Sequence, residues 1–298
     1  MAEPSDGIVD AHHHIWRLSD LPWLAGPIQP RIFGDYRAMQ RDYLIEDYLA
    51  DAKPAGVTRS VYVQTNWPPG RALAEVEWVQ SVADKHGWPH AIVGGADFSD
   101  PDTAAVIAAQ AKHPLLRGLR QQMHWHENPT YRFASRPDAF DDPTWRSGLA
   151  LLEKHGLLFE LQVFSSQMKG AAKLVKDFPG LQFVLIHAGM LEDTSPDGWK
   201  AWREGMAQLA QARNLAVKLS GLGTFVRRLD PELSIEISRQ TVAMFGAQRV
   251  MWGSNFPVEK LWTDYASLVR VLKDALAPLP PADRQAILHG TATRLYRL

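Results

Sequence analysis

The feature that most constrains the fold is a regular alternation of short apolar runs with longer amphipathic stretches. Several of the short runs are apolar at nearly every position, which is typical of strands buried on both faces of a parallel sheet. The stretches between them repeat apolar residues at helical spacing. The pattern predicts strands at 8–16, 60–65, 91–96, 115–123, 157–163, 182–187, 215–220 and 250–254, and helices at 44–55, 73–86, 100–112, 142–155, 167–178, 197–212, 231–245, 264–276 and 282–288.

Strands that alternate in this way with helices indicate an α/β protein. Within 298 residues, eight such repeats fit a closed (β/α)8 TIM barrel better than an open doubly wound sheet. No break in composition divides the chain, so we expect residues 1–298 to form a single domain. No Gly-x-Gly-x-x-Gly follows an early strand, which argues against a dinucleotide-binding fold.

A long irregular insert at about residues 17–43 separates the first predicted strand from the first helix. A loop of this length inside a compact domain is usually functional. Its position after the first strand predicts a lid or a pocket wall, and the alternative is a surface excursion packed by its own aromatic side chains. The prolines and aromatics on which both interpretations depend are Pro22, Trp23, Pro27, Pro30, Phe33 and Tyr36.

Charge and composition exclude several kinds of partner. The formal net charge is −1, so the electrostatics favour neither nucleic acid nor an anionic membrane. The chain has no cysteine, which removes disulfides, thiol nucleophiles and cysteine metal ligands. No apolar run is long enough to span a membrane, and residues 1–7 lack the features of a signal peptide. We therefore expect a cytoplasmic protein that acts on a small-molecule substrate, and leave its oligomeric state open.

The first strand carries a cluster of histidines. Side chains alternate along a strand, so Asp10, His12 and His14 point to one side and His13 to the other. Two imidazoles one strand repeat apart can hold one divalent cation or one substrate oxygen. An expression tag would lie at a terminus, whereas this run lies within an apolar segment. The remaining alternative is a histidine pair with a purely structural role.

Polar side chains also end the later predicted strands, and the carboxyl ends of the strands are where such barrels carry their reactive groups. His187 stands out because it ends an apolar strand and precedes Ala-Gly, which leaves room around a ring that can act as acid, base or ligand. The alternative for His187 is a hydrogen bond to a neighbouring loop. The other strand-end groups are Gln64, Asn66, Trp67, Asp97, Arg117, Arg120, Gln122, His124, His126, Glu160, Gln162, Lys218, Ser220 and Asn255.

Cationic residues on the fourth and seventh strands have two interpretations. An arginine that faces a barrel interior needs an anion or a carbonyl oxygen as its partner. Arg117 and Arg120 therefore either bind substrate or form internal salt bridges with Glu160 or Asp97. Lys218 has the same two interpretations.

Short motifs in this chain resemble the amidohydrolase superfamily. Val9-Asp10-Ala11-His12-His13-His14-Ile15-Trp16 is similar to its Asp-x-His-x-His opening. Residues 116–120 (Leu-Arg-Gly-Leu-Arg), 186–189 (Ile-His-Ala-Gly), 217–222 (Val-Lys-Leu-Ser-Gly-Leu) and 252–257 (Trp-Gly-Ser-Asn-Phe-Pro) match later strands in the same order. The resemblance covers nearly the whole chain. It is closest to the amidohydrolase-2 branch, which contains L-fuconolactonase-like, L-rhamnonolactonase-like and 2-pyrone-4,6-dicarboxylate lactonase enzymes.

The resemblance implies a (β/α)8 barrel that hydrolyses a lactone or an amide. It implies that His12, His14 and His187 hold a divalent metal, with zinc the expected ion, or that the histidine pair polarises the substrate carbonyl with little or no metal. Arg120, and with it Arg117, would match arginines that hold a carboxylate or a carbonyl oxygen.

Asn255 departs from the family pattern. The eighth strand of the family usually ends in an aspartate that deprotonates the attacking water, and asparagine can neither take that proton nor ligate zinc well. His187, Glu160 or a loop residue must then act as the base. The metal site also lacks its clear anionic ligand unless Glu160 helps.

The favoured hypothesis is a lactonase that opens a small sugar-derived or dicarboxylate lactone. His12 and His14 would polarise the carbonyl, His187 would handle the proton, and Asn255 would orient water or substrate. The predicted substrate-binding residues are Arg120, Arg117, Gln162, Lys218, His124 and Trp67. The alternatives are an amidohydrolase-fold decarboxylase or other lyase, an amide hydrolase, and a non-catalytic barrel that binds a ligand.

Overall fold

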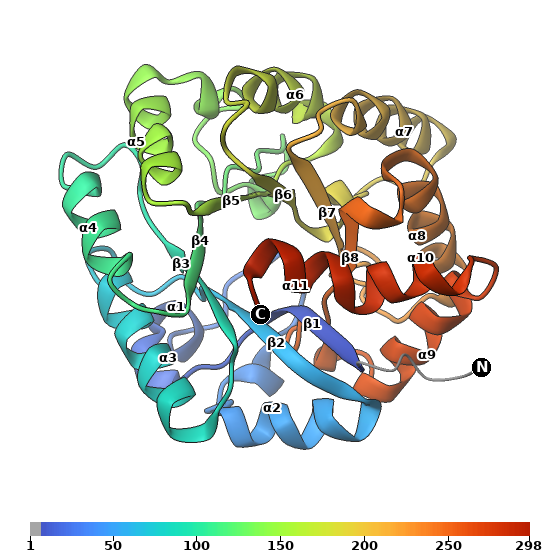
Figure 1. The fold of residues 1–298 in the computed structure, drawn as a ribbon, viewed down its shortest axis with the longest axis horizontal. Coiled ribbons are helices and arrows are strands. Elements are labelled where there is room, and N and C mark those ends of the chain that lie inside the picture. Colours follow the sequence, from blue (N-terminus) through green and yellow to red (C-terminus); the bar gives the residue numbers. More distant parts are fainter. Residues whose placement is uncertain (1–6) are drawn as a thin grey trace.

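Eight parallel strands pair in chain order in the computed structural model, which describes residues 7–298 (Figure 1). Nearly every strand residue is buried, as expected where helices cover one face and the barrel interior lies at the other. The predicted (β/α)8 barrel is thus confirmed. The strands are β1 (Ile8–His13), β2 (Val57–Val63), β3 (Ala91–Gly95), β4 (Leu116–Arg120), β5 (Leu158–Leu161), β6 (Phe183–Leu185), β7 (Leu215–Leu219) and β8 (Val250–Trp252).

The helices surround the barrel in Figure 1. Three of the longer ones begin at a capping residue followed directly by proline, at Asp142-Pro143, Ser195-Pro196 and Asp230-Pro231, and each capping side chain accepts a hydrogen bond from an amide of the first turn. The helices are α1 (Pro22–Ala25), α2 (Ile45–Ala52), α3 (Ala72–His86), α4 (Thr103–Gln110), α5 (Pro143–Lys154), α6 (Met168–Asp177), α7 (Pro196–Ala210), α8 (Pro231–Phe245), α9 (Tyr265–Leu276), α10 (Pro281–Gln285) and α11 (Thr291–Tyr296).

Several element ends differ from the sequence-based expectation. The helix expected from residue 100 begins at Thr103, because Asp100 turns the chain and accepts a hydrogen bond from the Asp102 amide (2.7 Å). The fourth strand ends at Arg120, not at residue 123. The last helical region continues past residue 288 through a wider turn (Ala286–Gly290) into α11. The expected lack of a signal peptide concerns residues 1–7, of which all but Gly7 lie outside the described part of the chain.

The barrel closes between β1 and the segment that follows β8. The His14 amide donates to the Phe256 carbonyl (2.8 Å), and the Asn255 amide donates to the His12 carbonyl (2.7 Å). Gly253 packs so tightly here that a Cβ added to it would lie 2.5 Å from the Cβ of His12. This close approach requires glycine, and it brings Asn255 beside the histidines of β1.

Asp10 holds the closure from the helix side of β1, where Tyr48 of α2 and Tyr265 of α9 reach it. Its buried carboxylate accepts hydrogen bonds from the amide and hydroxyl of Ser254 (2.8 and 2.6 Å) and from the hydroxyls of Tyr265 (2.7 Å) and Tyr48 (3.0 Å). Burial raises the pKa of Asp10, and these donors oppose the rise by stabilising the carboxylate. Asp10 is therefore the structural member of the first-strand motif.

The direction of Asp10 differs from the sequence-based expectation. Val9 and Ala11 face the barrel interior, and the pairing of β1 shifts register between Asp10 and His13. The expectation that Asp10 points to the same side as His12 is therefore wrong.

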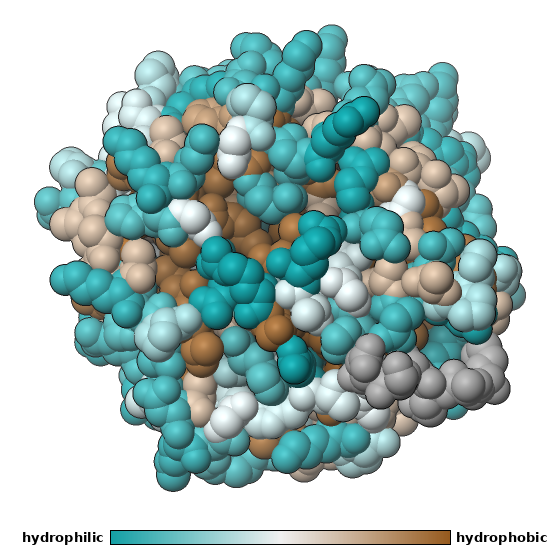
Figure 2. All heavy atoms as spheres, viewed as in Figure 1, coloured by the Kyte–Doolittle hydropathy of each residue, from teal (hydrophilic) through white to brown (hydrophobic). Residues whose placement is uncertain are grey.

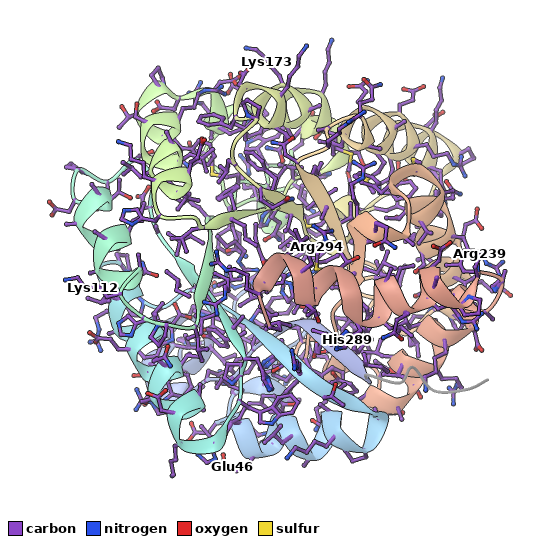
Figure 3. All side chains as sticks on the ribbon, in the orientation of Figure 1. Glu46, Lys112, Lys173, Arg239, His289 and Arg294 are labelled. Carbon is purple, nitrogen blue, oxygen red and sulfur yellow. The ribbon has the colours of Figure 1, made fainter. Side chains whose placement is uncertain are left out.

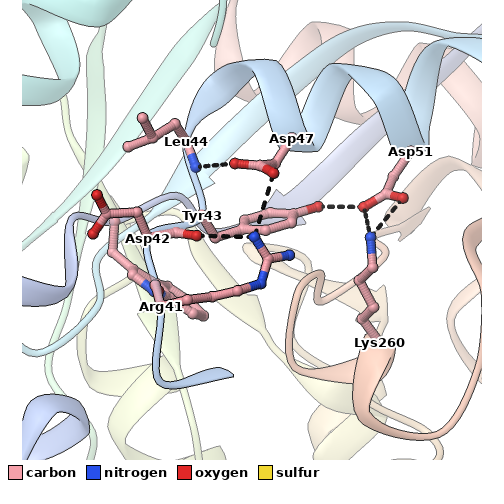
Figure 4. A network of polar contacts seen from close by, with 8 residues as sticks. Arg41, Asp42, Tyr43, Leu44, Asp47, Asp51 and Lys260 are labelled. Carbon is pink, nitrogen blue, oxygen red and sulfur yellow. Dashed lines mark hydrogen bonds and ion pairs between the residues drawn. The ribbon is translucent and has the colours of Figure 1, made fainter. Parts of the chain in front are cut away.

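A second set of contacts holds the same closure from outside (Figure 4). Asp51 of α2 accepts hydrogen bonds from Lys260 (2.6 and 2.8 Å) and from the Tyr43 hydroxyl (2.7 Å). Asp47, one turn earlier, accepts from the Leu44 amide (2.9 Å). The segment that follows Asn255 is thereby tied to the first long helix.

The opposite end of the barrel is covered by α10 and α11, which cross it in Figure 1. The buried Tyr296 hydroxyl donates to Glu160 Oε1 (2.7 Å), and the same oxygen pairs with Lys218 Nζ (2.5 Å). Arg117 joins this end as well, since its Nε donates to the Tyr296 carbonyl (2.7 Å). A buried polar layer therefore links the barrel interior to the last helix.

The outer face over α10 and α11 is largely hydrophilic (Figure 2). Charged side chains such as Lys112, Lys173 and Arg239 project from the periphery into solvent (Figure 3). None of the helices between residues 7 and 298 is both long enough and apolar enough to cross a bilayer.

Candidate active site

A cavity of about 240 Å³ opens at the carboxyl ends of the strands. His14 follows β1, Arg120 ends β4, Gln162 follows β5, His187 follows β6 and Asn255 follows β8, and all five line this cavity. The structure thus brings together side chains from five strands that the sequence analysis identified separately.

Three imidazole rings meet on one side of the cavity. The His12 ring centroid lies 5.1 Å from that of His14 and 4.8 Å from that of His187. His14 and His187 line the cavity, whereas His12 is fully buried behind them. The expectation was that His12 polarises a substrate carbonyl directly or through a metal, and this position leaves only the second way.

Burial keeps these imidazoles neutral at pH 7. Burial, followed by the positive charge of Arg120, lowers the pKa of His14 to about 3. Burial also lowers the pKa of His12 and of His187 well below 6.5, and nearby cations add to the shift. A neutral imidazole has one nitrogen that donates and one that carries a lone pair.

Hydrogen bonds decide which nitrogen of His14 carries the proton. Its Nδ1 lies 2.7 Å from the Val63 carbonyl oxygen, which can only accept, so Nδ1 is the donor and Nε2 keeps the lone pair. His14 is thus suited to take a proton or to ligate a metal, and not to donate to a substrate carbonyl. The Nδ1 of His187 lies 2.9 Å from the Ser220 hydroxyl. A Cβ at Gly221 would come within 2.6 Å of that nitrogen, so glycine gives the ring its room.

The backbone around the cavity is held in an unusual conformation. Asn66, His187, Met190 and Asn255 all have positive φ angles (60°, 55°, 50° and 55°), and all four line the cavity. Non-glycine residues seldom adopt this left-handed region, and those that do cluster at functional sites. The clustering supports a functional role for this end of the barrel.

Arg120 is the buried cation of the cavity. It is only 4% exposed; one of its N–H groups donates to the Gln64 carbonyl (2.6 Å), and its Nε has no hydrogen-bond partner among the described residues. The alternative of an Arg120–Glu160 salt bridge does not hold, because Glu160 pairs with Lys218. Burial lowers the pKa of Arg120. An incompletely paired guanidinium at this depth is suited to bind an anionic group.

The charged side chains that line the cavity, among the described residues, are arginines. Arg31 also lines it and leaves its Nε without a hydrogen-bond partner among the residues described. Within residues 7–298, no aspartate or glutamate contributes to the lining. Two guanidinium groups without a lining carboxylate make the cavity electropositive and favour a negatively charged ligand.

The insert of residues 17–43 forms one wall of the cavity through Trp23, Phe33 and Met39. It is also packed by its own aromatic rings, since the Phe33 centroid lies 6.4 Å from that of Trp23 and 5.6 Å from that of Tyr36. Both interpretations of the insert therefore describe the structure: it packs on itself and walls the cavity. Its action as a lid stays a prediction.

Three predicted substrate-binding residues do not line the cavity. Arg117 lies three positions before Arg120 and therefore on the opposite face of the strand, where it binds the carbonyls of Tyr296 and Pro114. Lys218 is fully buried in the ion pair with Glu160. Trp67 packs against Trp78, with ring centroids 6.0 Å apart. The expectation that these three contact substrate is corrected accordingly.

The other two predicted substrate-binding residues, His124 and Gln162, do line the cavity. Burial lowers the pKa of His124 to about 3, and its ring lies 5.1 Å from that of Phe133. Gln162 Oε1 is buried and finds no partner in the described part of the chain. Both side chains have polar capacity left for a ligand.

The ring nitrogens of His12, His14 and His187 are the kind of donor atom that a divalent ion accepts. Neither ring nitrogen of His12 has a hydrogen-bond partner among residues 7–298 although both are buried, and the Val63 contact orients His14 as outer contacts orient metal-binding imidazoles. Their arrangement is less complete, because no group of three or more His, Cys, Asp or Glu in the described chain stands ready to hold an ion. The rings would have to turn toward one point.

Sequence reasoning missed Arg31, Thr224 and Glu259. Arg31 and Thr224 line the cavity from loops, where no periodic pattern fixes the direction of a side chain. Glu259 lies behind the lining, and the signal that could have found it is a lone carboxylate in the apolar stretch after Asn255.

Comparison with known proteins gives one family match and several relatives. Residues 9–298 match the family model Amidohydro_2, described as amidohydrolase. Over 293 residues the chain is 38% identical to uncharacterized protein y4mH of Sinorhizobium fredii (strain NBRC 101917 / NGR234), with 98% of each chain covered. It is 28% identical over 295 residues to L-fucono-1,5-lactonase of Burkholderia ambifaria (strain ATCC BAA-244 / DSM 16087 / CCUG 44356 / LMG 19182 / AMMD), covering 97% of this chain and 95% of that one.

A solved structure agrees with the fold over its full length. The crystal structure of an amidohydrolase from Burkholderia multivorans with bound zinc superposes with a TM-score of 0.82 at 26% identity, covering 98% of this chain and 99% of the other. The two chains therefore share the barrel fold over nearly their whole lengths.

Proposed function

The chain belongs to the amidohydrolase family, and from this premise we propose that it is a hydrolase that opens a small lactone carrying a carboxylate group. The observation that carries the proposal is Arg120, a buried guanidinium that faces the cavity without an ion-pair partner among the described residues and next to neutral imidazoles. The lactonase named among the relatives supports the reaction class. The electropositive lining supports an anionic substrate, of sugar-derived or dicarboxylate type.

In the proposed reaction Arg120 binds the substrate carboxylate and Asn255 holds a water molecule. The water oxygen adds to the lactone carbonyl carbon while one of its protons passes to the neutral His187. The tetrahedral intermediate then collapses, the ring C–O bond breaks, and the leaving ring oxygen takes the proton back from His187. The product is the open hydroxy acid.

A divalent metal is part of the proposal, because the family and the zinc of the Burkholderia multivorans structure suggest one. His12 and His14 would hold it, and it would polarise the lactone carbonyl. His187 would be a third ligand only if another group took the proton of the water, because its one lone pair cannot serve both. Removal and return of zinc during the assay, with metal content measured alongside, tests this part separately.

The test is hydrolysis of paired lactones followed with a pH indicator on protein purified without chelator. Each pair consists of an aldonolactone and the aldarolactone of the same sugar, which differ only in a hydroxymethyl or a carboxylate group. We expect kcat/KM to favour the carboxylate member at least about tenfold, equivalent to about 1.4 kcal/mol. Preference for the neutral member would contradict the anionic substrate, and no hydrolysis of either would contradict the lactonase.

A second candidate is decarboxylation of an unsaturated or aromatic acid. Asn255 in place of an aspartate favours it, because loss of carbon dioxide needs no attacking water and hence no base for one. Release of carbon dioxide from such acids, together with no change on the lactones, would identify this activity. Tight binding of a carboxylate ligand without any turnover would instead indicate a binding protein.

A further inference from the structure

The three backbone carbonyls of residues 63–65, at the end of β2, each hold one side chain of the cavity. In chain order they accept hydrogen bonds from His14 Nδ1 (2.7 Å), from an N–H group of Arg120 (2.6 Å) and from the Trp23 indole (3.0 Å). All three side chains line the cavity. The conformation of residues 63–65 therefore sets the positions of a histidine, an arginine and one wall of the insert.

Glu75, in the first turn of α3, holds this segment from behind. It is 1% exposed and lies behind the cavity lining. Its Oε1 accepts three hydrogen bonds, from the Thr65 amide (2.6 Å), the Thr65 hydroxyl (3.0 Å) and the Tyr62 hydroxyl (2.8 Å). Nothing in the proposed reaction so far uses this carboxylate.

A single peptide group connects Glu75 to Arg120. The Gln64 carbonyl and the Thr65 amide belong to the same planar trans peptide, so they point in opposite directions. Its N–H faces Glu75, and its oxygen faces Arg120. A carboxylate can only accept and a guanidinium can only donate, so both charges require this orientation. A reversed peptide group would turn its oxygen toward the carboxylate and its N–H toward the guanidinium.

The peptide group between the two charges suits an anion-binding site. A carboxylate in direct contact with Arg120 would occupy donors that a substrate carboxylate needs. Here Arg120 Nε keeps no hydrogen-bond partner among residues 7–298. Burial raises the pKa of Glu75, and the hydrogen bonds from Thr65 and Tyr62, together with the positive charge of Arg120, oppose the rise.

We propose that Glu75 is the positioning residue for Arg120. Its Oε1 fixes the peptide group between residues 64 and 65, and the carbonyl of that group holds the guanidinium where it meets the carboxylate of the substrate. The preference for a carboxylate-bearing lactone thus depends on a side chain of α3 that lies behind the cavity lining. This inference rests on the proposed function, because it requires Arg120 to bind the substrate carboxylate.

The first test compares Glu75→Gln with Glu75→Met. Both variants remove the same negative charge, so any effect of that charge on an anionic substrate is common to both. Glutamine keeps an oxygen that accepts from the Thr65 amide, whereas methionine has none. The quantity measured is the ratio of kcat/KM for the carboxylate-bearing lactone to kcat/KM for the neutral lactone of the same sugar.

We expect this ratio to be at least about tenfold lower in Glu75→Met than in Glu75→Gln, because the guanidinium loses its anchor. The loss should come from a higher KM for the carboxylate-bearing lactone, with little change in kcat. Equal ratios in the two variants would overturn the proposal.

Tyr62→Phe is the matched control for packing. It removes a donor from the same oxygen of Glu75 and leaves the Thr65 amide in place. It should lower the free energy of unfolding in urea and leave the ratio unchanged. A fall in the ratio as large as that in Glu75→Met would show that Glu75 acts through packing alone, and the proposal would be wrong.

Glu75→Asp is the variant to use if Glu75→Met does not fold. It keeps the charge, but its carboxylate is one methylene too short to reach the Thr65 amide as Glu75 does. The ratio should therefore fall below that of the wild type. A wild-type ratio in folded Glu75→Asp would count against the proposal.

Nuclear magnetic resonance gives a readout that needs no substrate. The side-chain Nε–H signal of Arg120 is identified as the one that disappears in Arg120→Gln. It should shift or broaden in Glu75→Met relative to Glu75→Gln. If the wild type hydrolyses no lactone, the proposed function fails, while these spectra still decide whether Glu75 positions Arg120. The same Arg120 signal in both variants would overturn the positioning.

Discussion

At the scale of the residue, three positions on one strand separate a cavity cation from a structural one. Arg120 faces the cavity, whereas Arg117 faces the far end of the barrel and binds the Tyr296 carbonyl (2.7 Å). Strand geometry, and not residue type, makes the distinction. The two arginines therefore form a natural test and control.

Arg120→Gln should lower kcat/KM for a carboxylate-bearing lactone about 10- to 100-fold, because a charge-assisted hydrogen bond to a buried anion is lost (about 1.5–3 kcal/mol). The rate for the neutral lactone of the same sugar should change much less. Arg117→Gln removes the same charge from the same strand and should leave the ratio of the two rates unchanged. Equal losses on both lactones in Arg120→Gln would show that Arg120 does not bind the carboxylate.

His187→Asn should reduce kcat by about 10²–10⁴-fold, the usual contribution of a positioned proton acceptor. Single-turnover measurement at saturating substrate separates this loss from a binding defect. His13→Asn is the comparison, because His13 lies on the other face of β1 and stacks on Tyr48 (3.8 Å between ring centroids). Turnover that survives unchanged in His187→Asn would remove His187 from the reaction.

At the scale of the element, the insert and the last helix act at opposite ends of the barrel. The insert supplies Arg31 to the cavity, and α11 supplies Tyr296 to the buried polar layer beneath it. Changes in the first should therefore alter substrate binding, and changes in the second should alter stability.

Arg31→Gln should raise KM for the anionic lactone by about tenfold with little effect on kcat, since the insert binds substrate away from the reacting carbonyl. Arg37→Gln, an exposed arginine of the same insert paired with Asp35, serves as the control. An unchanged KM in Arg31→Gln would show that the insert contributes only its apolar wall.

Tyr296→Phe should lower the free energy of unfolding by about 1–2 kcal/mol, because Glu160 loses a buried hydrogen-bond donor. Chemical denaturation measures this loss. Turnover should be unaffected, since Tyr296 does not line the cavity. A fall in kcat without a fall in stability would contradict the separation of the two ends.

At the scale of the whole molecule, buried neutral histidines make stability depend on pH. Burial holds the pKa of His124 at about 3, whereas a histidine in an unfolded chain has a pKa near 6.5. The unfolded state therefore binds more protons below pH 6.5, and stability falls as pH falls through that value toward 3. This residue alone should account for about 2 kcal/mol between pH 7 and pH 5.

Urea unfolding at pH 7 and pH 5 measures this slope. His124→Gln should show a smaller difference between the two pH values than the wild type, by about 2 kcal/mol. The same slope in both proteins would mean that His124 is not held neutral by the fold.

The order of strands was predictable from the sequence because burial imposes a pattern on every strand and helix. The lining of the cavity was predictable where it lies on that pattern, as for His14, Arg120 and His187. It was not predictable for Arg31, whose direction is set by the packing of an irregular insert. For Lys218 the sequence left two interpretations open, and the internal salt bridge with Glu160 is the one that the structure shows. The direction and the partner of such side chains depend on contacts between segments far apart in the sequence, and the local hydrophobic pattern carries no information about those contacts.

The closure held by Asp10 also determines when the site can form during synthesis of the chain. Asp10 and its partner Ser254 are 244 positions apart. At about 5–20 residues per second of synthesis, roughly 10–50 seconds separate the appearance of the Asp10 carboxylate from that of Ser254, whose amide and hydroxyl later donate to it. During that interval β1 is an open edge and the histidines have no cavity. A ligand that contacts both His14 and Asn255 therefore finds the two side chains together only after the ring has closed.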